Sequence, residues 1–198
     1  MSPLSPFTPI NRDKCINEIV VCKMPQTIIS NLLKRILLVT IAASFLYAPS
    51  PVDAAPRLGR PAPEFKVTST TGQTISQNNY RGYVLILDFF ATWCQPCRQS
   101  IPHLVEMNRK YGKQGLQILG LSVDEDGERA VRTFTDEFRV NYPLALAGDS
   151  TTVDFGIRSV PVMYLIDKKG KLVEVYRGYS DEMARSMEQS IKRLLAEK

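Results

Sequence analysis

Histidine and cysteine are scarce in this chain, which has one histidine and four cysteines among 198 residues. A structural zinc site needs four ligands, and beyond residue 54 the chain has only two cysteines, Cys94 and Cys97, and one histidine, His103. Covalent haem attachment needs a histidine directly after the second cysteine of the pair, where this chain has Arg98. The sequence therefore argues against both kinds of metal centre, and we expect no cofactor.

A strong excess of charge of one sign is also absent. The formal net charge is +5 at pH 7, of which residues 1–54 contribute +2 and residues 55–198 contribute +3. Basic residues of the second segment are scattered among acidic ones and form no stripe. Nucleic-acid-binding proteins usually gather Lys and Arg on one face, so we expect no nucleic-acid partner.

The chain has no hydrophobic run long enough to cross a bilayer, which takes roughly 20 residues. The run from Ile36 to Tyr47 has twelve, follows Lys34-Arg35 and precedes small residues up to Ala54. A basic segment, a short apolar segment and a small-residue cleavage site together are typical of a secretory signal. We expect cleavage after Ala54, and an uncleaved membrane anchor is the alternative.

The first 23 residues contain two of the four cysteines and show no periodicity, whereas Met24 would begin a signal of ordinary length. We therefore expect Met24 to be the true start, residues 1–54 to be extension and signal, and residues 55–198 to be one folded domain. Only Cys94 and Cys97 would then remain in the mature chain. Two cysteines three apart in an oxidising compartment are typical of a redox pair.

Periodicity in residues 55–198 predicts an α/β fold, with a mixed central sheet, helices on both faces and an N-terminal hairpin. Residues 84–90 are apolar throughout, as expected for a central strand covered on both faces. Ser180 should cap the last helix, whose apolar residues Met183, Met187, Ile191 and Leu195 we interpret as core rather than as a copper site. The predicted elements are hairpin strands at 65–69 and 73–76, strands at 84–90, 116–123, 162–166 and 171–176, helices at 96–111, 128–140 and 180–196, and a helical turn at 151–155.

The acidic stretch at 124–128 precedes the predicted helix at 128–140. Its spacing does not fit a calcium-binding loop, and acidic residues are favourable at the start of a helix. We therefore interpret the stretch as a helix start and not as a cation site.

The segment Trp93-Cys94-Gln95-Pro96-Cys97 lies between the predicted strand at 84–90 and the helix that follows it. The two-residue spacer lets the sulfurs form a disulfide. The helix start directs backbone N–H groups and the positive end of the helix dipole at the first sulfur. This environment favours the thiolate, which is the attacking species in disulfide exchange. The segment therefore predicts a thiol–disulfide oxidoreductase.

Four separated segments resemble one known family. The stretch 87–102 is similar to the thioredoxin signature, and residues 62–65, 159–161 and 164–170 add matches in the same order. Together they resemble the secreted thioredoxin-like reductases of the TlpA/ResA group, over about residues 58–196. The resemblance implies a thioredoxin-like fold in which Cys94 is the exposed nucleophile and Cys97 is the buried cysteine that resolves the mixed disulfide.

The resemblance also assigns a substrate-binding surface. Pro161 corresponds to the proline that is cis in this fold and faces the cysteine pair, where its neighbours offer backbone groups to an extended substrate. Val160 and Trp93 would line that surface, and Pro96 would stiffen the first turn of the helix.

Asp88 is the only charged residue in the apolar run that leads to the cysteines. Burial of a lone carboxylate is costly, and the usual response is a raised pKa that keeps the group partly protonated. Thioredoxins have Asp at this place, where it helps to move the proton of the buried thiol. Many TlpA/ResA-like proteins have an uncharged residue there and a Glu at the place of Ser100, so this chain departs from them. We expect Asp88 to fill the role of that Glu.

The leading functional prediction is an extracytoplasmic or periplasmic reductase of disulfides in exported proteins. In the family these are most often apocytochrome c or copper-site cysteines. Such an enzyme needs electrons from a membrane thiol carrier, because its compartment has no reducing pool. The alternatives are an oxidase that introduces disulfides and a binding protein in which Cys94 and Cys97 carry copper(I), which soft thiolates favour.

Overall fold

A computed structural model describes residues 56–125 and 127–197 of the protein. The expected start at Met24, the signal and the cleavage site after Ala54 lie outside the described residues. Among the helices in these two ranges, none combines the length and the apolar composition needed to span a membrane.

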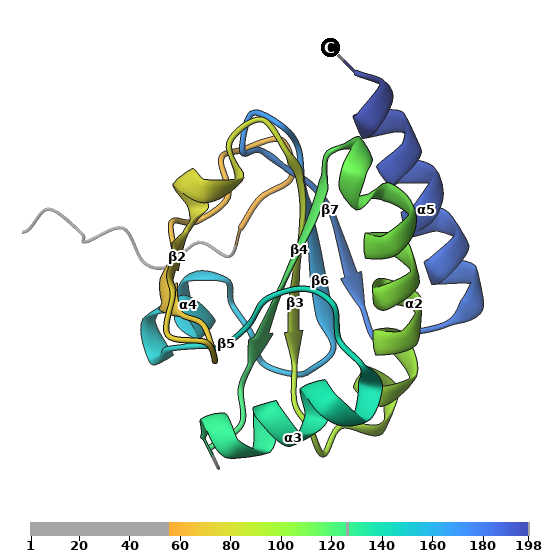
Figure 1. The fold of residues 1–198 in the computed structure, drawn as a ribbon. Helices are drawn as coiled ribbons and strands as arrows, with labels where there is room; N and C mark the ends of the chain where they lie inside the picture. The colour runs from red at the N-terminus through yellow and green to blue at the C-terminus, as the bar shows by residue number, and fades with distance from the viewer. Residues whose placement is uncertain (1–55, 126, 198) are drawn as a thin grey trace, which may run out of the picture. The chain divides into compact units, whose positions relative to one another are not determined.

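The centre of the domain is a five-stranded sheet with the order β5-β4-β3-β6-β7 (Figure 1). β3 pairs in parallel with β4 and antiparallel with β6, which confirms the expected mixed sheet. All seven residues of β3 are buried, as the continuous apolar run predicts for a strand covered on both faces. The strands are β3 (Val84–Phe90), β4 (Leu116–Ser122), β5 (Leu144–Leu146), β6 (Val162–Ile166) and β7 (Leu172–Arg177).

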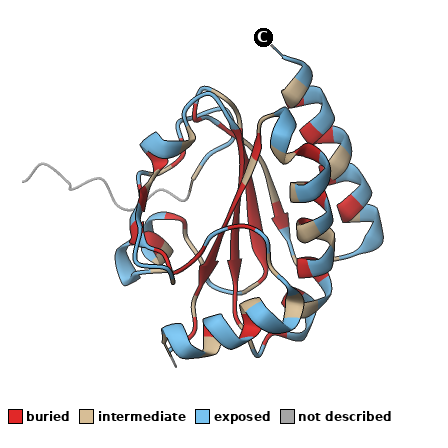
Figure 2. Ribbon diagram, viewed as in Figure 1, coloured by how far each residue is buried: buried red, intermediate tan, exposed pale blue. Residues whose placement is uncertain are grey.

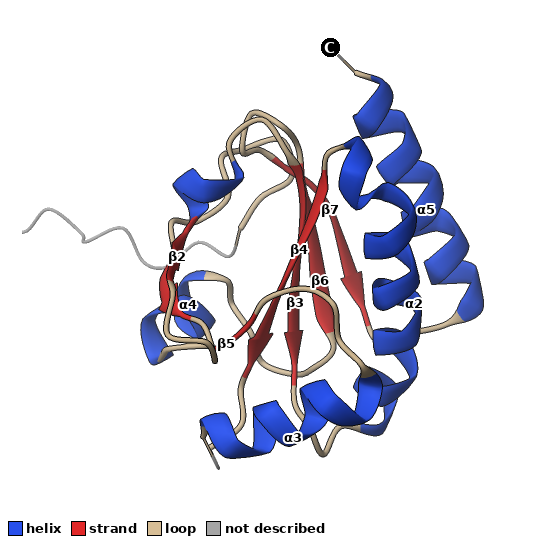
Figure 3. Ribbon diagram, in the orientation of Figure 1, coloured by secondary structure: helices blue, strands red, loops and turns tan. Residues whose placement is uncertain are grey.

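One face of the sheet is covered by three helices, α2 (Gln95–Tyr111), α3 (Glu128–Phe138) and α5 (Asp181–Ala196) (Figure 1). The other face is covered by a separate hairpin of β1 (Lys66–Thr68) and β2 (Thr74–Ser76), together with the short helices η2 (Gln77–Tyr80) and α4 (Asp149–Asp154). Figure 3 shows this division of helices and strands, and Figure 2 shows that buried residues follow the sheet and the inner sides of the helices. The predicted fold class and the N-terminal hairpin are confirmed.

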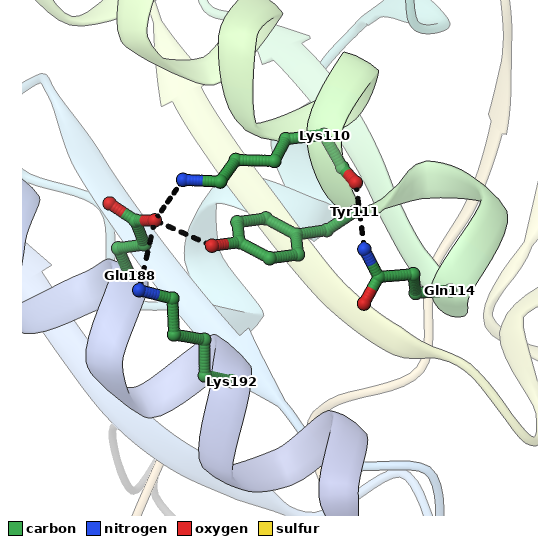
Figure 4. Close-up of polar contacts among 5 residues, drawn as sticks. All are labelled: Lys110, Tyr111, Gln114, Glu188 and Lys192. Atoms are coloured by element: carbon green, nitrogen blue, oxygen red, sulfur yellow. Dashed lines mark hydrogen bonds and ion pairs between the residues drawn. The ribbon is translucent and has the colours of Figure 1, made fainter.

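A polar cluster around Glu188 joins α2 to α5 (Figure 4). Glu188 Oε1 accepts hydrogen bonds from Tyr111 Oη at 2.5 Å and Lys110 Nζ at 2.7 Å, and Lys192 Nζ lies 3.2 Å away. The hydrogen bonds from Lys110 and Tyr111 lower the pKa of Glu188 to about 2. Because α2 carries both cysteines, this cluster fixes the helix of the redox pair against α5.

The fold differs from expectation in its short elements and in the buried stripe of α5, and the short helices η2 and η3 (Gly112–Gln114) were not predicted. The three-residue strand β5 (Leu144–Leu146) was not predicted, since it is shorter than a pattern of period two can reveal. In α5, Leu194 is buried to 3% exposure while Leu195 packs only at the edge. The predicted stripe advances in steps of four residues, and each step turns 40° further than one full turn of the helix. Its fourth position, Leu195, is therefore rotated away from the core. The observed core stripe mixes steps of three and four and includes Ala184, Met187, Ile191 and Leu194.

Candidate active site

The two cysteines lie where β3 gives way to α2. Cys94 is the N-cap of α2, and its Sγ accepts a hydrogen bond from the Cys97 backbone N–H at 3.3 Å. The two residues form a disulfide, with their Cα atoms 5.2 Å apart. Cys94 is 5% exposed and Cys97 is fully buried. The first cysteine is thus the more accessible one but is less exposed than expected, because the cap position and the neighbouring chain at Val160 cover it.

The segment Val160-Pro161 lies directly against this disulfide. The peptide bond between the two residues is cis, and the Val160 carbonyl oxygen is 3.7 Å from Cys94 Sγ. A disulfide sulfur carries no hydrogen, so this is a van der Waals contact and leaves the carbonyl free to accept a hydrogen bond. Pro161 is buried, whereas Pro96 is exposed in the first turn of α2. The structure therefore brings Val160 and Pro161 to the cysteine pair.

Trp93 is 71% exposed and forms a shared wall between two clefts. One cleft, of about 480 Å³, continues from Trp93 along Val160, and the charged residues among those that line it are Asp124, Glu125, Asp149 and Arg158. The other lies between the first turn of α2 and α3 and is lined by charged residues of both helices. The first of these clefts adjoins Cys94 through both Trp93 and Val160.

Asp88 is fully buried in the middle of β3. It pairs with Gly120 of β4 and Met163 of β6, and shares its face of the strand with Ile86 and Phe90, which pack in the same core as Cys97. Within the part of the chain that the structure describes, neither carboxylate oxygen has a hydrogen-bond partner. Burial raises the pKa of Asp88 from its ordinary value of 3.8 to about 7. The expected burial and raised pKa are confirmed, and the group is poised to exchange a proton near neutral pH.

Ser100 stands at the place where the TlpA/ResA resemblance led us to expect a glutamate. Its hydroxyl is buried and donates to the Cys97 carbonyl at 2.9 Å. The side chain therefore satisfies the backbone of the first helical turn, and among the described residues Asp88 is the only carboxylate that is completely buried.

A clamp on the loop that carries the cysteines was not predicted from the sequence. Asp124 accepts hydrogen bonds from Thr92 Oγ1 at 2.7 Å, from the Thr92 backbone N–H at 3.0 Å and from Ser122 Oγ at 2.5 Å. On the other side of Thr92, Arg98 Nη1 donates to the Thr92 carbonyl at 3.2 Å. The loop before Trp93 is thereby held at both its N–H and its C=O.

Asp124 was interpreted as part of a helix start, but it is 8% exposed and lies directly after β4. The sequence feature that could have indicated this role is the position of Asp124 directly after a buried strand. Parallel strands end at the same edge of a sheet, so the residues that follow β3 and β4 meet there. Contacts with an aromatic ring hold Arg98 in this position, because its guanidinium carbon lies 4.7 Å from the centre of the Phe138 ring.

His103 packs beside the ring of Tyr179, with 6.4 Å between the ring centroids. Burial lowers the pKa of His103. Within residues 56–125 and 127–197, no three His, Cys, Asp or Glu side chains gather in a way that could hold a metal ion. The structure brings together at this site two sulfurs, the completely buried Asp88 carboxyl nearby and the backbone groups around them.

A mixed sheet flanked by helices, with a redox disulfide at a helix start facing a cis-proline segment, defines a thioredoxin-fold thiol–disulfide oxidoreductase. The protein belongs to the AhpC/TSA family, which matches residues 58–175.

Two curated relatives are named thiol-disulfide oxidoreductase ResA. The one from Bacillus thuringiensis subsp. konkukian (strain 97-27) is 30% identical over 138 residues, which cover 69% of this chain and 78% of the relative. The one from Geobacillus thermodenitrificans (strain NG80-2) is 31% identical over 154 residues, covering 77% and 86%. The crystal structure of a thiol:disulfide interchange protein from Chlorobium tepidum TLS matches with a TM-score of 0.63 and 27% identity, covering 73% of this chain and 100% of that one. The enzyme class predicted from the Cys94–Cys97 pair is thus confirmed.

Proposed function

We propose that the protein is an extracytoplasmic reductase of disulfides in exported proteins. The observation that carries this proposal is the position of Cys94, at the N-cap of α2 and in contact with the carbonyl of Val160. An extended substrate strand that accepts or donates hydrogen bonds at Val160 would bring its own disulfide within reach of Cys94 Sγ.

The proposed reaction starts from the dithiol form. The Cys94 thiolate attacks one sulfur of the substrate disulfide, and the other substrate sulfur leaves as a thiolate and takes up a proton. Cys97 then loses its proton and attacks Cys94 Sγ, which releases the second substrate thiolate and restores the Cys94–Cys97 disulfide. Two electrons pass from the enzyme to the substrate, so a second thiol compound must reduce the enzyme again.

Asp88 is the proposed acceptor of the Cys97 proton. It is a carboxyl in the core that contains Cys97, and its pKa of about 7 lets it take up a proton at neutral pH and release it again. Replacing Asp88 by Asn should slow the release of substrate from the mixed disulfide by about a hundredfold at pH 7. An unchanged rate of that step would remove the assignment.

The substrate surface we propose consists of Val160, Pro161, Trp93 and Pro96, with the cleft beside Val160 accepting the substrate chain. Trp93 supports this role because a tryptophan that is 71% exposed offers a large apolar surface to a partner. Val160 supports it because its carbonyl is free at the sulfur that reacts.

The secretory signal predicted in residues 1–54 supports an extracytoplasmic location. In such a compartment the electrons would come from a membrane thiol carrier. Apocytochrome c and copper-site cysteines are the substrates we propose, following the TlpA/ResA resemblance.

The reduction potential of the Cys94–Cys97 pair tests the direction of the reaction. We would measure it by equilibration with glutathione in a Cys15→Ser/Cys22→Ser background, so that Cys94 and Cys97 are the only cysteines. A value near about −270 mV supports the reductase, whereas a value near about −120 mV supports the oxidase. A Cys97→Ser variant, which cannot release its substrate, should trap exported proteins as mixed disulfides with Cys94. Failure to reduce insulin, together with stoichiometric copper(I) binding, would instead favour the metal-handling alternative.

A further inference from the structure

The core on the α2 side of the sheet contains three buried tyrosines, Tyr111, Tyr142 and Tyr176. Two of them have partners, since Tyr111 donates to a glutamate of α5 and Tyr176 to a glutamate of β7. The hydroxyl of Tyr142 is buried and has no partner among the described residues. The same core contains the unpartnered carboxylate of Asp88. One buried donor and one buried acceptor thus remain, and buried polar groups are rarely left without a hydrogen bond.

Gly120 of β4 places these two groups next to each other. It is the direct neighbour of Asp88 in the sheet, and neighbouring strands lie about 4.8 Å apart. A Cβ atom built on Gly120 would be 3.6 Å from Cε2 of the Tyr142 ring and 2.3 Å from Cδ2 of Leu144. The ring of Tyr142 therefore lies over the bare backbone of Gly120, one strand away from the carboxyl.

The backbone on both sides of Tyr142 is fixed to the elements that surround Asp88. Asn108 of α2 donates to the Asn141 carbonyl at 2.9 Å, and Asn141 Nδ2 donates to the Val105 carbonyl at 3.2 Å. On the other side, the Gly120 backbone N–H donates to the Pro143 carbonyl at 3.0 Å. The ring is thus held between α2 and β4 and is not a mobile surface group.

The chemistry of the two groups is complementary. Burial and the charge of Asp88 raise the pKa of Tyr142 well above its ordinary value, so its hydroxyl remains a donor at neutral pH. α3 contributes the apolar Val131 and Phe134 to this core, and β6 contributes Met163. On α2, the buried Ser100 hydroxyl donates to the Cys97 carbonyl, and His103 packs beside the ring of Tyr179. From α2, the titratable group in this core is Cys97, which is the proposed source of the proton.

We propose that Tyr142 is the positioning residue of the buried carboxyl, its hydroxyl donating a hydrogen bond to ionised Asp88 directly or through one water molecule. This inference rests on the proposed role of Asp88 as proton acceptor. The hydrogen bond stabilises the carboxylate and not the neutral acid, so it sets the pH at which Asp88 can accept the Cys97 proton. Tyr142 keeps its own proton, and in the transfer the S–H bond of Cys97 breaks and an O–H bond of Asp88 forms.

The test is Tyr142→Phe, which removes one oxygen and keeps the ring. The pH dependence of substrate release from the mixed disulfide is measured together with the infrared absorption of the protonated Asp88 carboxyl. We expect both profiles to move to higher pH by about one unit, since a hydrogen bond to a charged group is lost. Tyr164→Phe is the matched control. Its hydroxyl donates to the Phe155 carbonyl at 2.5 Å on the other face of the sheet, and its loss should leave both profiles in place.

Two further variants separate this inference from the proposed function. If Asp88→Asn leaves the release step unchanged, the role of Asp88 fails. If Asp88→Asn slows that step but Tyr142→Phe leaves both profiles unchanged, only the role of Tyr142 fails. In the double variant, Tyr142→Phe should have no further effect on the pH profile.

Urea unfolding supplies a second readout, because Tyr142→Phe should destabilise the oxidised protein at pH 8 and not at pH 5. Equal effects at both pH values would overturn the inference.

Discussion

Replacing Asp88 by Asn should stabilise the oxidised protein, and by an amount that depends on pH. The folded protein holds this carboxyl with a pKa of about 7, against an ordinary value of 3.8 in an exposed chain. The difference is about three pH units, and each unit corresponds to about 1.4 kcal/mol. Ionised Asp88 therefore costs about 4 kcal/mol of folding free energy at high pH, a cost that neutral Asn does not carry.

The sign follows from proton binding. Below about pH 4 the carboxyl is protonated in both states, so its ionisation does not affect stability. Between about pH 4 and pH 7 the unfolded chain releases the proton while the folded protein keeps it, so the wild type loses stability as pH rises. Above about pH 7 the loss is complete. The free energy of unfolding of the Asp88→Asn variant lacks this dependence on pH. The difference in free energy of unfolding between the variant and the wild type should therefore grow from pH 4 to pH 8.

The assay is urea unfolding of the oxidised protein at pH 4, 5.5 and 8, with Cys15 and Cys22 replaced by Ser. Asp124→Asn is the matched control, since Asp124 is also a buried carboxylate but accepts hydrogen bonds from Thr92 and Ser122. That variant should lose about 2 kcal/mol at pH 8, because hydrogen bonds to a charged group are weakened. A free-energy difference between Asp88→Asn and wild type that is the same at all three pH values would refute the reasoning.

Three other predictions follow from the described contacts. Trp93→Ala should raise KM for a protein disulfide roughly tenfold with little change in kcat, and steady-state kinetics with insulin would contradict this if kcat fell instead. Gly120→Ala should destabilise the protein by about 2 kcal/mol, measured by urea unfolding, because its Cβ would lie 2.3 Å from the Leu144 side chain; an unchanged midpoint would show that Leu144 moves freely. Glu188→Gln should cost about 1 kcal/mol at pH 7. Since the pKa of Glu188 is lowered from 4.5 to about 2, that difference should shrink as pH falls through this range, and a constant difference would contradict the assignment.

The sequence predicted best those features whose signal is local. The bounds of β3 match the apolar run 84–90, and α5 begins after Ser180, whose hydroxyl accepts from the Met183 N–H. The cysteine pair could be predicted because its function depends on a spacing of three residues. The raised pKa of Asp88 could be predicted because a single charge in an apolar run has no solvent to reach.

The parts of the site that were missed depend on contacts between distant segments. Asp124 and Thr92 are 32 residues apart in sequence and meet only because β3 and β4 end at the same edge of the sheet. Tyr142 reaches the neighbourhood of Asp88 because Gly120 has no side chain, which neither segment indicates alone. The strand β5, three residues long, is recognisable only through its pairing with β4.

The complete enclosure of β3 has a kinetic consequence for the carboxyl it carries. No atom of Asp88 reaches bulk solvent, and every neighbour along the strand is equally sealed. A proton that arrives there during one half of the catalytic cycle can exchange with water only when the core opens briefly or when the adjoining sulfur takes it back. In the proposed mechanism the protonation state of Asp88 therefore persists after each transfer until the core opens or the sulfur takes the proton back. The rates of these two events, and not the acidity of the medium, set how long it persists.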